Sequence, residues 1–375
     1  MKLTTAGESH GKCLVGILED VPSGLEIDVD QINSYLALRQ SGYGRGNRQK
    51  IEKDKVEILS GVRNKTTLGS PVAFAVVNKD YANWQAYMSP EGCDVSQKTL
   101  TAVRPGHADL TGMIKYGHDD ARNVLERASA RETAVRVVAG TIARQYLNAL
   151  GVEISGYVVG VCGVQDENVY TFDQLKRAKD EPLFMLDDQK QKDAMALVDQ
   201  LKADGDTAGG IIEIRVKGLK SGFGSCMQYD TKLDAILAGA LFSVQAIKGV
   251  EFGLGMQTGK LKGSQVHDQI SYNDGAFSRT SNNAGGIEGG MSNGEEIVIR
   301  CAMKPIPTLM KGLNTVDFIT KTPCKSAGER SDVVAICACE IILESVVATA
   351  LSSVVAKRLG GDTMQEIKAR YSLLT

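Results

Sequence analysis

A polar heptapeptide at residues 127–133, Arg-Ala-Ser-Ala-Arg-Glu-Thr, is followed at once by an apolar helical pattern. The apolar residues recur every three or four positions, as they do along one face of a helix. They are Ala134, Val135, Val138, Ile142 and Tyr146. We therefore expect the heptapeptide at a helix N-terminus, where free backbone N–H groups and the helix dipole favour anions. Because Arg127 and Arg131 add bidentate donors, the stretch predicts a site for a multiply anionic small molecule.

The overall charge argues against a general attraction to polyanions as the reason for so many arginines. The chain of 375 residues has a net charge of -2, so it offers no global attraction for nucleic acid or an anionic membrane. The N-terminus lacks the apolar core of a secretory signal, and the apolar runs fall short of the ~20 residues that span a bilayer. The eight cysteines are scattered without a Cys-x-x-Cys pair, which predicts reduced, mostly buried thiols in a cytoplasmic protein. The Cys337-x-Cys339 pair is too weak a motif to predict a metal site.

Secondary-structure signals alternate between strands and helices along the chain, and no linker separates domains. A glycine-flanked loop carries Glu8, Ser9 and His10, and Asp28 or Asp30 can cap a helix that ends near Gln40. A second helix cap is expected at Asp230 or Thr231. We expect strands at 13–18, 56–62, 72–77, 151–164, 211–216, 250–255 and 297–303, and helices at 28–40, 134–150, 194–201, 231–247 and 339–359. Residues 80–100, which contain the single tryptophan Trp84, are expected to be an irregular surface excursion without chemistry, and 259–281 a polar loop. This order predicts two similar layers of sheet and helix that share one core.

Two glycine-rich stretches are candidate ligand loops. In the first, glycines separate Arg39, Arg45 and Arg48, which fits either a solvated basic loop or a mobile loop that closes over a phosphate. The second, residues 281–294, contains five glycines, and its backbone amides are expected to face a ligand. A strand pattern follows it, so it is no dinucleotide-binding fingerprint. A Pro-Gly turn presents His107 between Arg104 and Asp109, although a lone histidine is more often structural, as we expect for His118 and His267.

Several of these stretches together resemble the chorismate synthase family, in the family's order, from about residue 3 to residue 360. They are Gly7-Glu-Ser-His-Gly11, Arg104-Pro-Gly-His-Ala-Asp109, the heptapeptide at 127–133, Lys248-Gly-Val-Glu-Phe-Gly253, Ser281-Asn-Asn-Ala-Gly-Gly286 and Lys304-Pro305. Each motif alone is weak, whereas the set is highly specific.

The resemblance implies an α+β fold, a β-α-β sandwich with helices packed between two antiparallel sheet layers, as one domain over residues 1–375 and assembled as a homotetramer. It implies a lyase of the shikimate pathway. The reaction is an anti 1,4-elimination of phosphate from 5-enolpyruvylshikimate 3-phosphate, giving chorismate. Reduced FMN is required without net redox change, and an external system reduces the flavin. A bifunctional form with NADPH:FMN reductase activity is the alternative within the family.

The resemblance also assigns roles to individual residues. His10, with Ser9 beside it, corresponds to the acid near the leaving phosphate, and His107 to the histidine that protonates reduced flavin. Asp332, supported by Ser129, corresponds to the aspartate that keeps flavin N5 able to accept the ring hydrogen. The positions that match FMN-binding residues are Arg127, Ala128, Ser129, Gln245, Ala246, Gly289, Lys304, Pro305, Ile306, Pro307, Thr308 and Arg330. Positions matched to substrate or NADP binding are Arg39, Arg45, Arg48 and Arg131.

One segment departs from the family pattern. The common C-terminal signature Arg-His-Asp-Pro-Cys reads Arg330-Ser331-Asp332-Val333-Val334 here, which leaves the tuning of Asp332 open. Two other functions are compatible with parts of the pattern: a flavin-using oxidoreductase, and a non-catalytic flavin- or phosphate-binding protein. The missing dinucleotide fingerprint disfavours the first. His10, His107 and Asp332 together disfavour the second, because binding alone does not require them.

Overall fold

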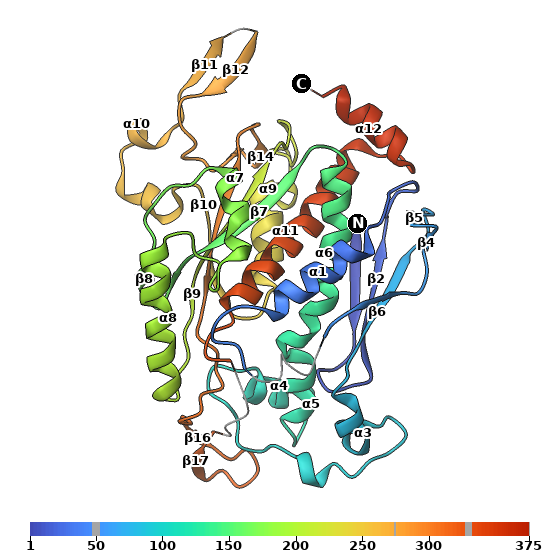
Figure 1. The fold of residues 1–375 in the computed structure, drawn as a ribbon, viewed down its shortest axis with the longest axis vertical. Coiled ribbons are helices and arrows are strands. Elements are labelled where there is room, and N and C mark those ends of the chain that lie inside the picture. Colours follow the sequence, from blue (N-terminus) through green and yellow to red (C-terminus); the bar gives the residue numbers. More distant parts are fainter. Residues whose placement is uncertain (47–52, 274, 327–331, 375) are drawn as a thin grey trace.

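Two antiparallel sheets with helices between them form the body of the computed structural model, which describes residues 1–46, 53–273, 275–326 and 332–374 (Figure 1). In spatial order the first sheet contains β1 (Lys2–Ala6), β2 (Cys13–Glu19), β6 (Val72–Val77) and β3 (Val56–Ile58). The second contains β10 (Ile247–Phe252), β15 (Ile297–Met303), β9 (Gly210–Lys217), β7 (Glu153–Val161) and β8 (Val164–Gln165). The mixed helix and sheet content expected from the sequence is therefore confirmed.

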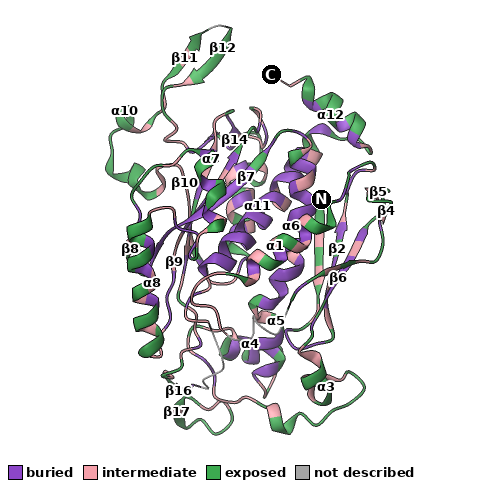
Figure 2. Cartoon of the chain, in the orientation of Figure 1, coloured by how far each residue is buried: buried purple, intermediate pink, exposed green. Residues whose placement is uncertain are grey.

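The central helices are α1 (Val29–Gln40), α6 (Thr133–Asn148), α9 (Leu233–Phe242) and α11 (Ile336–Leu359). Helix α6 packs on β1, β2 and β6, whereas α11 packs on α6, β7 and β9. Both helices are buried along most of their length (Figure 2), because each is covered by a sheet and by its neighbouring helices. The apolar stripe predicted for α6 thus understates its burial, because residues outside the stripe, such as Thr141 and Arg144, are buried as well.

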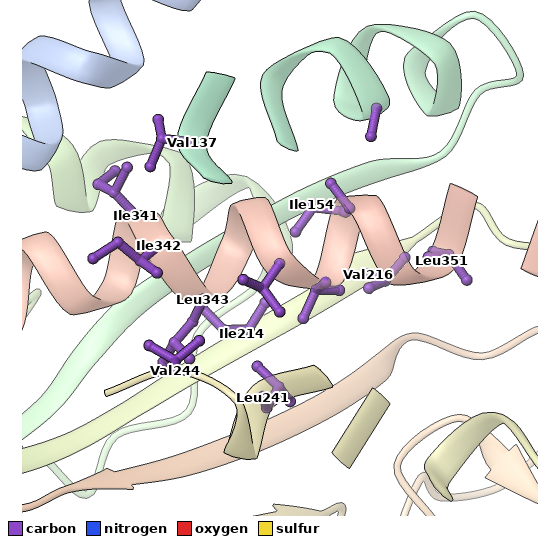
Figure 3. Close-up of a cluster of buried hydrophobic side chains, with 14 of the residues drawn as sticks. Val137, Ile154, Ile214, Val216, Leu241, Val244, Ile341, Ile342, Leu343 and Leu351 are labelled. Atoms are coloured by element: carbon purple, nitrogen blue, oxygen red, sulfur yellow. The ribbon is translucent and has the colours of Figure 1, made fainter. Parts of the chain in front are cut away.

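Close packing of α6 against α11 depends on a small residue. A Cβ at Gly140 would lie 2.3 Å from the Cβ of Ser345, so no larger residue fits at this crossing. Farther along, side chains of α11 interdigitate with Ile214 and Val216 of β9 and with Leu241 of α9 (Figure 3). Helix α11 is long and apolar enough to cross a membrane, but 83% of its most apolar window is buried, as expected of a core helix.

Shorter elements connect this frame. They are β4 (Val62–Arg63), β5 (Thr66–Thr67), α3 (Tyr81–Met88), η1 (Ser96–Lys98), α4 (Asp109–Tyr116), α5 (Arg122–Ala128), η2 (Ala130–Glu132), α7 (Phe172–Leu175), η3 (Lys176–Asp180), α8 (Asp188–Ala203), η4 (Tyr229–Thr231), η5 (Gly255–Lys260), α10 (Gly263–Val266), β11 (Ile270–Asn273), β12 (Ala276–Arg279), β13 (Ile287–Glu288), β14 (Met291–Ser292), β16 (Asn314–Val316), β17 (Pro323–Lys325) and α12 (Met364–Ser372).

Most predicted elements are confirmed, with several corrections. The cap of α1 is Asp28, whose carboxylate accepts a hydrogen bond from the backbone N–H of Gln31 at 3.0 Å. The strand predicted at 56–62 is wrong in its second half: β3 ends at Ile58, and the chain turns at Gly61 with φ of +82°. The segments 80–100 and 259–281 are also more regular than expected, since they contain α3 and η1, and α10 with the β11–β12 hairpin.

The helix predicted at 231–247 is shorter at both ends. It begins at Leu233 and stops at Phe242, because Ala246 takes a φ of +70° and turns the chain into β10. The eight cysteines are free, as expected, but the expectation that most are buried is wrong. Buried thiols are Cys301, Cys337 and Cys339, whereas Cys93, Cys162 and Cys226 are exposed.

Candidate active site

A cavity of about 580 Å³ opens where α6 and α11 both begin. Thr133 lines it from the first turn of α6, and Ala338 and Cys339 line it from the first turn of α11. Two helix N-termini therefore direct their positive ends into one space of the size that holds a small molecule. The predicted site residues that line it are Ser9, His10, Arg39, Arg45, His107, Ala128, Ser129, Arg131, Gln245, Ala246, Lys304, Ile306, Pro307, Thr308 and Asp332.

A few predicted site residues lie elsewhere. The guanidinium of Arg127 donates at 3.1 Å to the carbonyl oxygens of Thr5 and Gly7, so it connects α5 to the end of β1 and to the loop that follows. Gly289 lies in the β13–β14 turn, outside the lining of the cavity, and Pro305 is flanked by lining residues without lining it. Arg48 and Arg330 lie outside the described residues. The roles predicted for these residues stay predictions.

Two buried arginines share one carboxylate at the start of α6. The Asp54 Oδ2 atom lies 2.6 Å from Arg131 Nη1 and 3.5 Å from Arg39 Nη1. Arg39 also donates from Nε to the Thr133 hydroxyl at 3.1 Å. Burial lowers the pKa of Arg39 to about 10, with Asp54 opposing this change and Arg131 adding to it. Two guanidinium groups, both oriented by this carboxylate, therefore line one wall of the cavity.

The loop after α1 is joined to the segment before α11 by a second ion pair. Arg45 Nη1 lies 3.0 Å from Asp332 Oδ2, and the N–H of Gly46 donates to Asp332 Oδ1 at 2.6 Å. The backbone N–H of Val333 donates to the carbonyl of Gly44 at 2.9 Å. Asp332 is thus oriented by Arg45 and Gly46 in the loop after α1. Arg45 Nε is buried and has no hydrogen-bond partner among the described residues.

His10 is held between a carboxylate and an aromatic ring. Its Nδ1 lies 2.8 Å from Glu126 Oε1, and its backbone N–H donates to Glu126 Oε2 at 2.8 Å. Arg122 supports the same carboxylate at 3.1 Å, and Trp84 stacks on the imidazole with ring centroids 4.0 Å apart. Burial favours the neutral acid of Glu126, but hydrogen bonds from His10 and the charge of Arg122 outweigh it and lower the pKa of Glu126.

His107 has its own carboxylate and its own arginine. Its Nδ1 is hydrogen-bonded to Asp109 Oδ1, and Arg104 Nε donates to Asp109 Oδ2 at 2.8 Å. Arg104 Nη2 also lies 3.1 Å from His107 Nδ1, and Nη1 donates to the Thr308 hydroxyl at 3.1 Å. Burial acts to raise the pKa of Asp109, but hydrogen bonds from His107 and Arg104 lower it well below its usual range.

Sequence reasoning missed Asp54, Trp84 and Glu126 as parts of this site. Trp84 was expected to lie in a surface excursion without chemistry, yet it covers His10. Glu126 is separated from His10 by 116 positions and reads as an ordinary helical residue. Arg104 and Asp109 belong to the motif around His107, which was the available signal for their role.

The comparisons with known proteins agree with this geometry. The family model described as chorismate synthase matches residues 1–356. A chorismate synthase of Alkaliphilus metalliredigens is 51% identical over 376 residues, covering 100% of this chain and 99% of the relative. One of Thermus thermophilus is 49% identical over 372 residues, covering 99% and 97%. A solved structure titled as a crystal structure of chorismate synthase is 36% identical, has a TM-score of 0.80, and covers 99% of this chain and 96% of the other. Together with the cavity that gathers His10, His107 and Asp332, these matches show that the chain belongs to the chorismate synthase family, which makes it a carbon–oxygen lyase.

Proposed function

We propose that the cavity binds 5-enolpyruvylshikimate 3-phosphate beside reduced FMN and eliminates phosphate to give chorismate. The observation that carries the proposal is the convergence of two histidines, Asp332 and several cations on one cavity at two helix N-termini. The ring C–H bond and the C–O bond to phosphate break, a new C=C bond forms, and no net oxidation occurs.

The substrate's phosphate is assigned to the wall built from Arg39, Arg131 and Arg45. These three arginines present their guanidinium groups to the cavity, and the carboxylates of Asp54 and Asp332 orient them. The N-terminus of α6 adds its dipole at the same place. Because the arginines are held by buried hydrogen bonds, they are oriented before an anion arrives, which reduces the cost of binding.

His10 is proposed as the acid for the leaving phosphate, with Ser9 beside it. Expulsion of phosphate needs stabilisation of negative charge and a proton, and imidazole suits proton transfer near neutral pH. His107 is proposed to keep a proton near the flavin, and Asp332, with Ser129 in support, to act near flavin N5. Asp332 is already oriented by Arg45 and by the N–H of Gly46.

The residues around Gln245 fit reduced FMN. Gln245 Oε1 is buried without a hydrogen-bond partner among the described residues, while its Nε2 donates to Glu132 at 2.9 Å. Burial and the nearby charge of Lys248 lower the pKa of Lys304, so two lysines stand close together and suit a phosphate. We assign Gln245, Ala246, Lys304 and Thr308 to FMN. When bound, reduced FMN supplies electron density to the substrate and accepts the ring hydrogen.

We further propose a single cytoplasmic domain with the family's β-α-β sandwich and two similar sheet–helix halves. For the assembly we propose a homotetramer, supported by apolar side chains that remain exposed, such as Ile17 on the first sheet and Phe277 on the β11–β12 hairpin. Sedimentation velocity would test the assembly; a monomer at micromolar concentration would contradict it.

Activity with photoreduced FMN under anaerobic conditions tests the function. We expect chorismate from 5-enolpyruvylshikimate 3-phosphate with reduced FMN and none with oxidised FMN alone. We propose a monofunctional enzyme with an external reductant, so oxidised FMN with NADPH should also give none. Chorismate in that last mixture would make the enzyme bifunctional, whereas its absence from every mixture would overturn the proposed reaction.

A further inference from the structure

The hydrogen bonds around His10 distinguish its two ring nitrogens. Nδ1 lies 2.8 Å from Glu126 Oε1 and 3.1 Å from Oε2. Nothing among the described residues is hydrogen-bonded to Nε2, although His10 is 8% exposed and lines the cavity. A carboxylate accepts hydrogen bonds and cannot donate them. The ionised Glu126 therefore requires a hydrogen on Nδ1, and Nε2 is the nitrogen that exchanges its proton.

The position of Glu126 itself is determined by three contacts. Its Oε2 accepts the backbone N–H of His10, so the carboxylate follows the loop that carries the imidazole. Its Oε1 lies 3.1 Å from Arg122 Nη1, one helical turn earlier on α5. The backbone N–H of Ser9 donates to the carbonyl of Glu126 at 2.9 Å. Glu126 thus fixes both the loop that carries His10 and the imidazole ring of His10.

The face of the imidazole is covered by Trp84, and two cations lie against the Trp84 ring. Trp84 lies on His10 at 4.0 Å between centroids with an interplanar angle of 27°. Arg122 lies 4.8 Å and Lys98 lies 5.0 Å from the centre of the Trp84 ring. The indole N–H donates to Asp80 at 3.2 Å, which fixes the plane of the stack. The ring of His10 therefore cannot flip without displacing Trp84.

From these contacts we propose that Glu126 and Trp84 are positioning residues that hold His10 in the Nδ1-protonated tautomer, with Nε2 as the atom that donates the proton to the leaving phosphate. This inference deepens the proposed function and rests on it for the identity of the proton acceptor. A proton leaves the Nε2–H bond of the imidazolium and forms an O–H bond on phosphate, and the neutral imidazole keeps its hydrogen on Nδ1. Glu126 stays ionised throughout and is not itself the acid, as for the carboxylates that orient catalytic histidines.

The tautomer can be measured without turnover. The chain has four histidines, so magic-angle-spinning NMR of the protein labelled with ¹⁵N-histidine can be assigned through single substitutions. We expect the neutral His10 ring to carry its hydrogen on Nδ1 in the wild type and to become a mixture of tautomers in Glu126→Gln. Asp109→Asn is the matched control, because it removes the carboxylate of the other histidine and should change the signals of His107 alone. A wild-type His10 with its hydrogen on Nε2, or one unchanged in E126Q, would overturn the proposal.

Kinetic measurements distinguish a loss of His10 orientation from a general folding defect. In Glu126→Gln we expect kcat to fall by about 10²-fold, at the low end of the loss for a general acid, with KM nearly unchanged. The kcat–pH profile should also shift to lower pH, because removing a negative charge disfavours the imidazolium. Among the described residues, the charged groups placed against the ring or against Trp84 are Glu126 and Arg122 from α5, Lys98 and Asp80. FMN affinity reports whether the variant is folded.

Conservative variants keep the proposal testable if E126Q folds poorly. Glu126→Asp retains the charge and should recover part of the turnover and the wild-type pH profile. Trp84→Phe should retain more turnover than Trp84→Ala, because a ring still covers the imidazole. Wild-type kcat in E126Q, or equal losses in the two Trp84 variants, would overturn the positioning role. Failure of the proposed reaction is distinct, since it would appear as no chorismate from the wild type.

Discussion

The cavity has two corners, a first one around His10 and a second one around His107. Their hydrogen bonds are arranged alike, but the arginine makes different contacts in each. Each imidazole places Nδ1 on a buried carboxylate, and each carboxylate is supported by a buried arginine. At His10 the arginine bonds the carboxylate and lies over Trp84. At His107 the arginine contacts the carboxylate, the imidazole and Thr308 together. His107 is thus connected to the segment proposed to hold FMN, whereas His10 is connected to α5 through Glu126 and to α3 through Trp84.

This difference supports a division of labour within one cavity. A ring held by a carboxylate and covered by an indole has one free nitrogen for a partner. A ring that also contacts a guanidinium belongs to a network whose geometry changes when any member changes. We therefore expect a substitution at the first corner to affect His10 alone. A substitution at the second corner should affect the whole network of His107, Asp109 and Arg104.

Replacement of the two histidines should give the largest effects. We expect His10→Ala and His107→Ala each to lower kcat by about 10²–10⁴-fold, the usual loss for one general acid. FMN binding should remain largely intact in both. The absorbance spectrum of bound reduced FMN should change in H107A and not in H10A. Wild-type turnover in either variant would remove that histidine from the mechanism, and identical spectra would abolish the distinction between the corners.

Asp109→Asn tests the second corner through stability. Breaking a buried ion pair costs about 3–5 kcal/mol, so we expect a loss of about 3 kcal/mol in the free energy of unfolding at pH 7. The folded-state pKa of Asp109 is lowered, so its contribution is present above the unfolded value near 3.9 and is lost as pH falls through the folded pKa. The difference between wild type and variant should therefore narrow below about pH 4.

Urea unfolding followed by Trp84 fluorescence can measure this difference, because the chain has one tryptophan and it lies at the other corner. Wild type and D109N should be compared at pH 7 and pH 3 at constant ionic strength. If the difference in the free energy of unfolding between wild type and D109N were the same at pH 7 and pH 3, the carboxylate of Asp109 would not stabilise the fold through its charge.

The same comparison shows which features the sequence could predict. The loop that carries His10, the start of α6 and the turn at His107 follow from local glycine, proline and apolar patterns. Contacts between distant segments do not: Asp54 meets Arg131 across 77 positions, and Glu126 meets His10 across 116. The helix predicted through Ile247 failed for a related reason. Its apolar spacing continues past Phe242 to Val244 and Ile247, but the chain turns at Ala246, and Ile247 pairs with Met303 of β15 as the first residue of β10.

Lys304→Ala should give a smaller and selective effect. A hydrogen bond to a charged group contributes about 1.5–3 kcal/mol, so we expect FMN to bind at least about tenfold more weakly. Riboflavin lacks the phosphate and should lose much less. Fluorescence quenching titrations with both ligands measure this ratio. Equal losses for both would show that Lys304 does not bind the phosphate.

Ionic strength should produce the smallest effect and tests the arginine wall. Arg39 and Arg131 are buried and share Asp54, so a bound anion completes a charge cluster that solvent reaches poorly. Salt screens buried pairs less than exposed ones, so we expect KM for the substrate to rise only about threefold between 0.05 and 0.5 M salt. Riboflavin affinity, which involves no ligand charge, is the matched control and should stay constant. If KM were unaffected, the arginines would not contribute charge to substrate binding. If kcat at saturating substrate fell instead, salt would be acting on the His10 corner. The arginine wall and the His10 corner would then be coupled rather than separate.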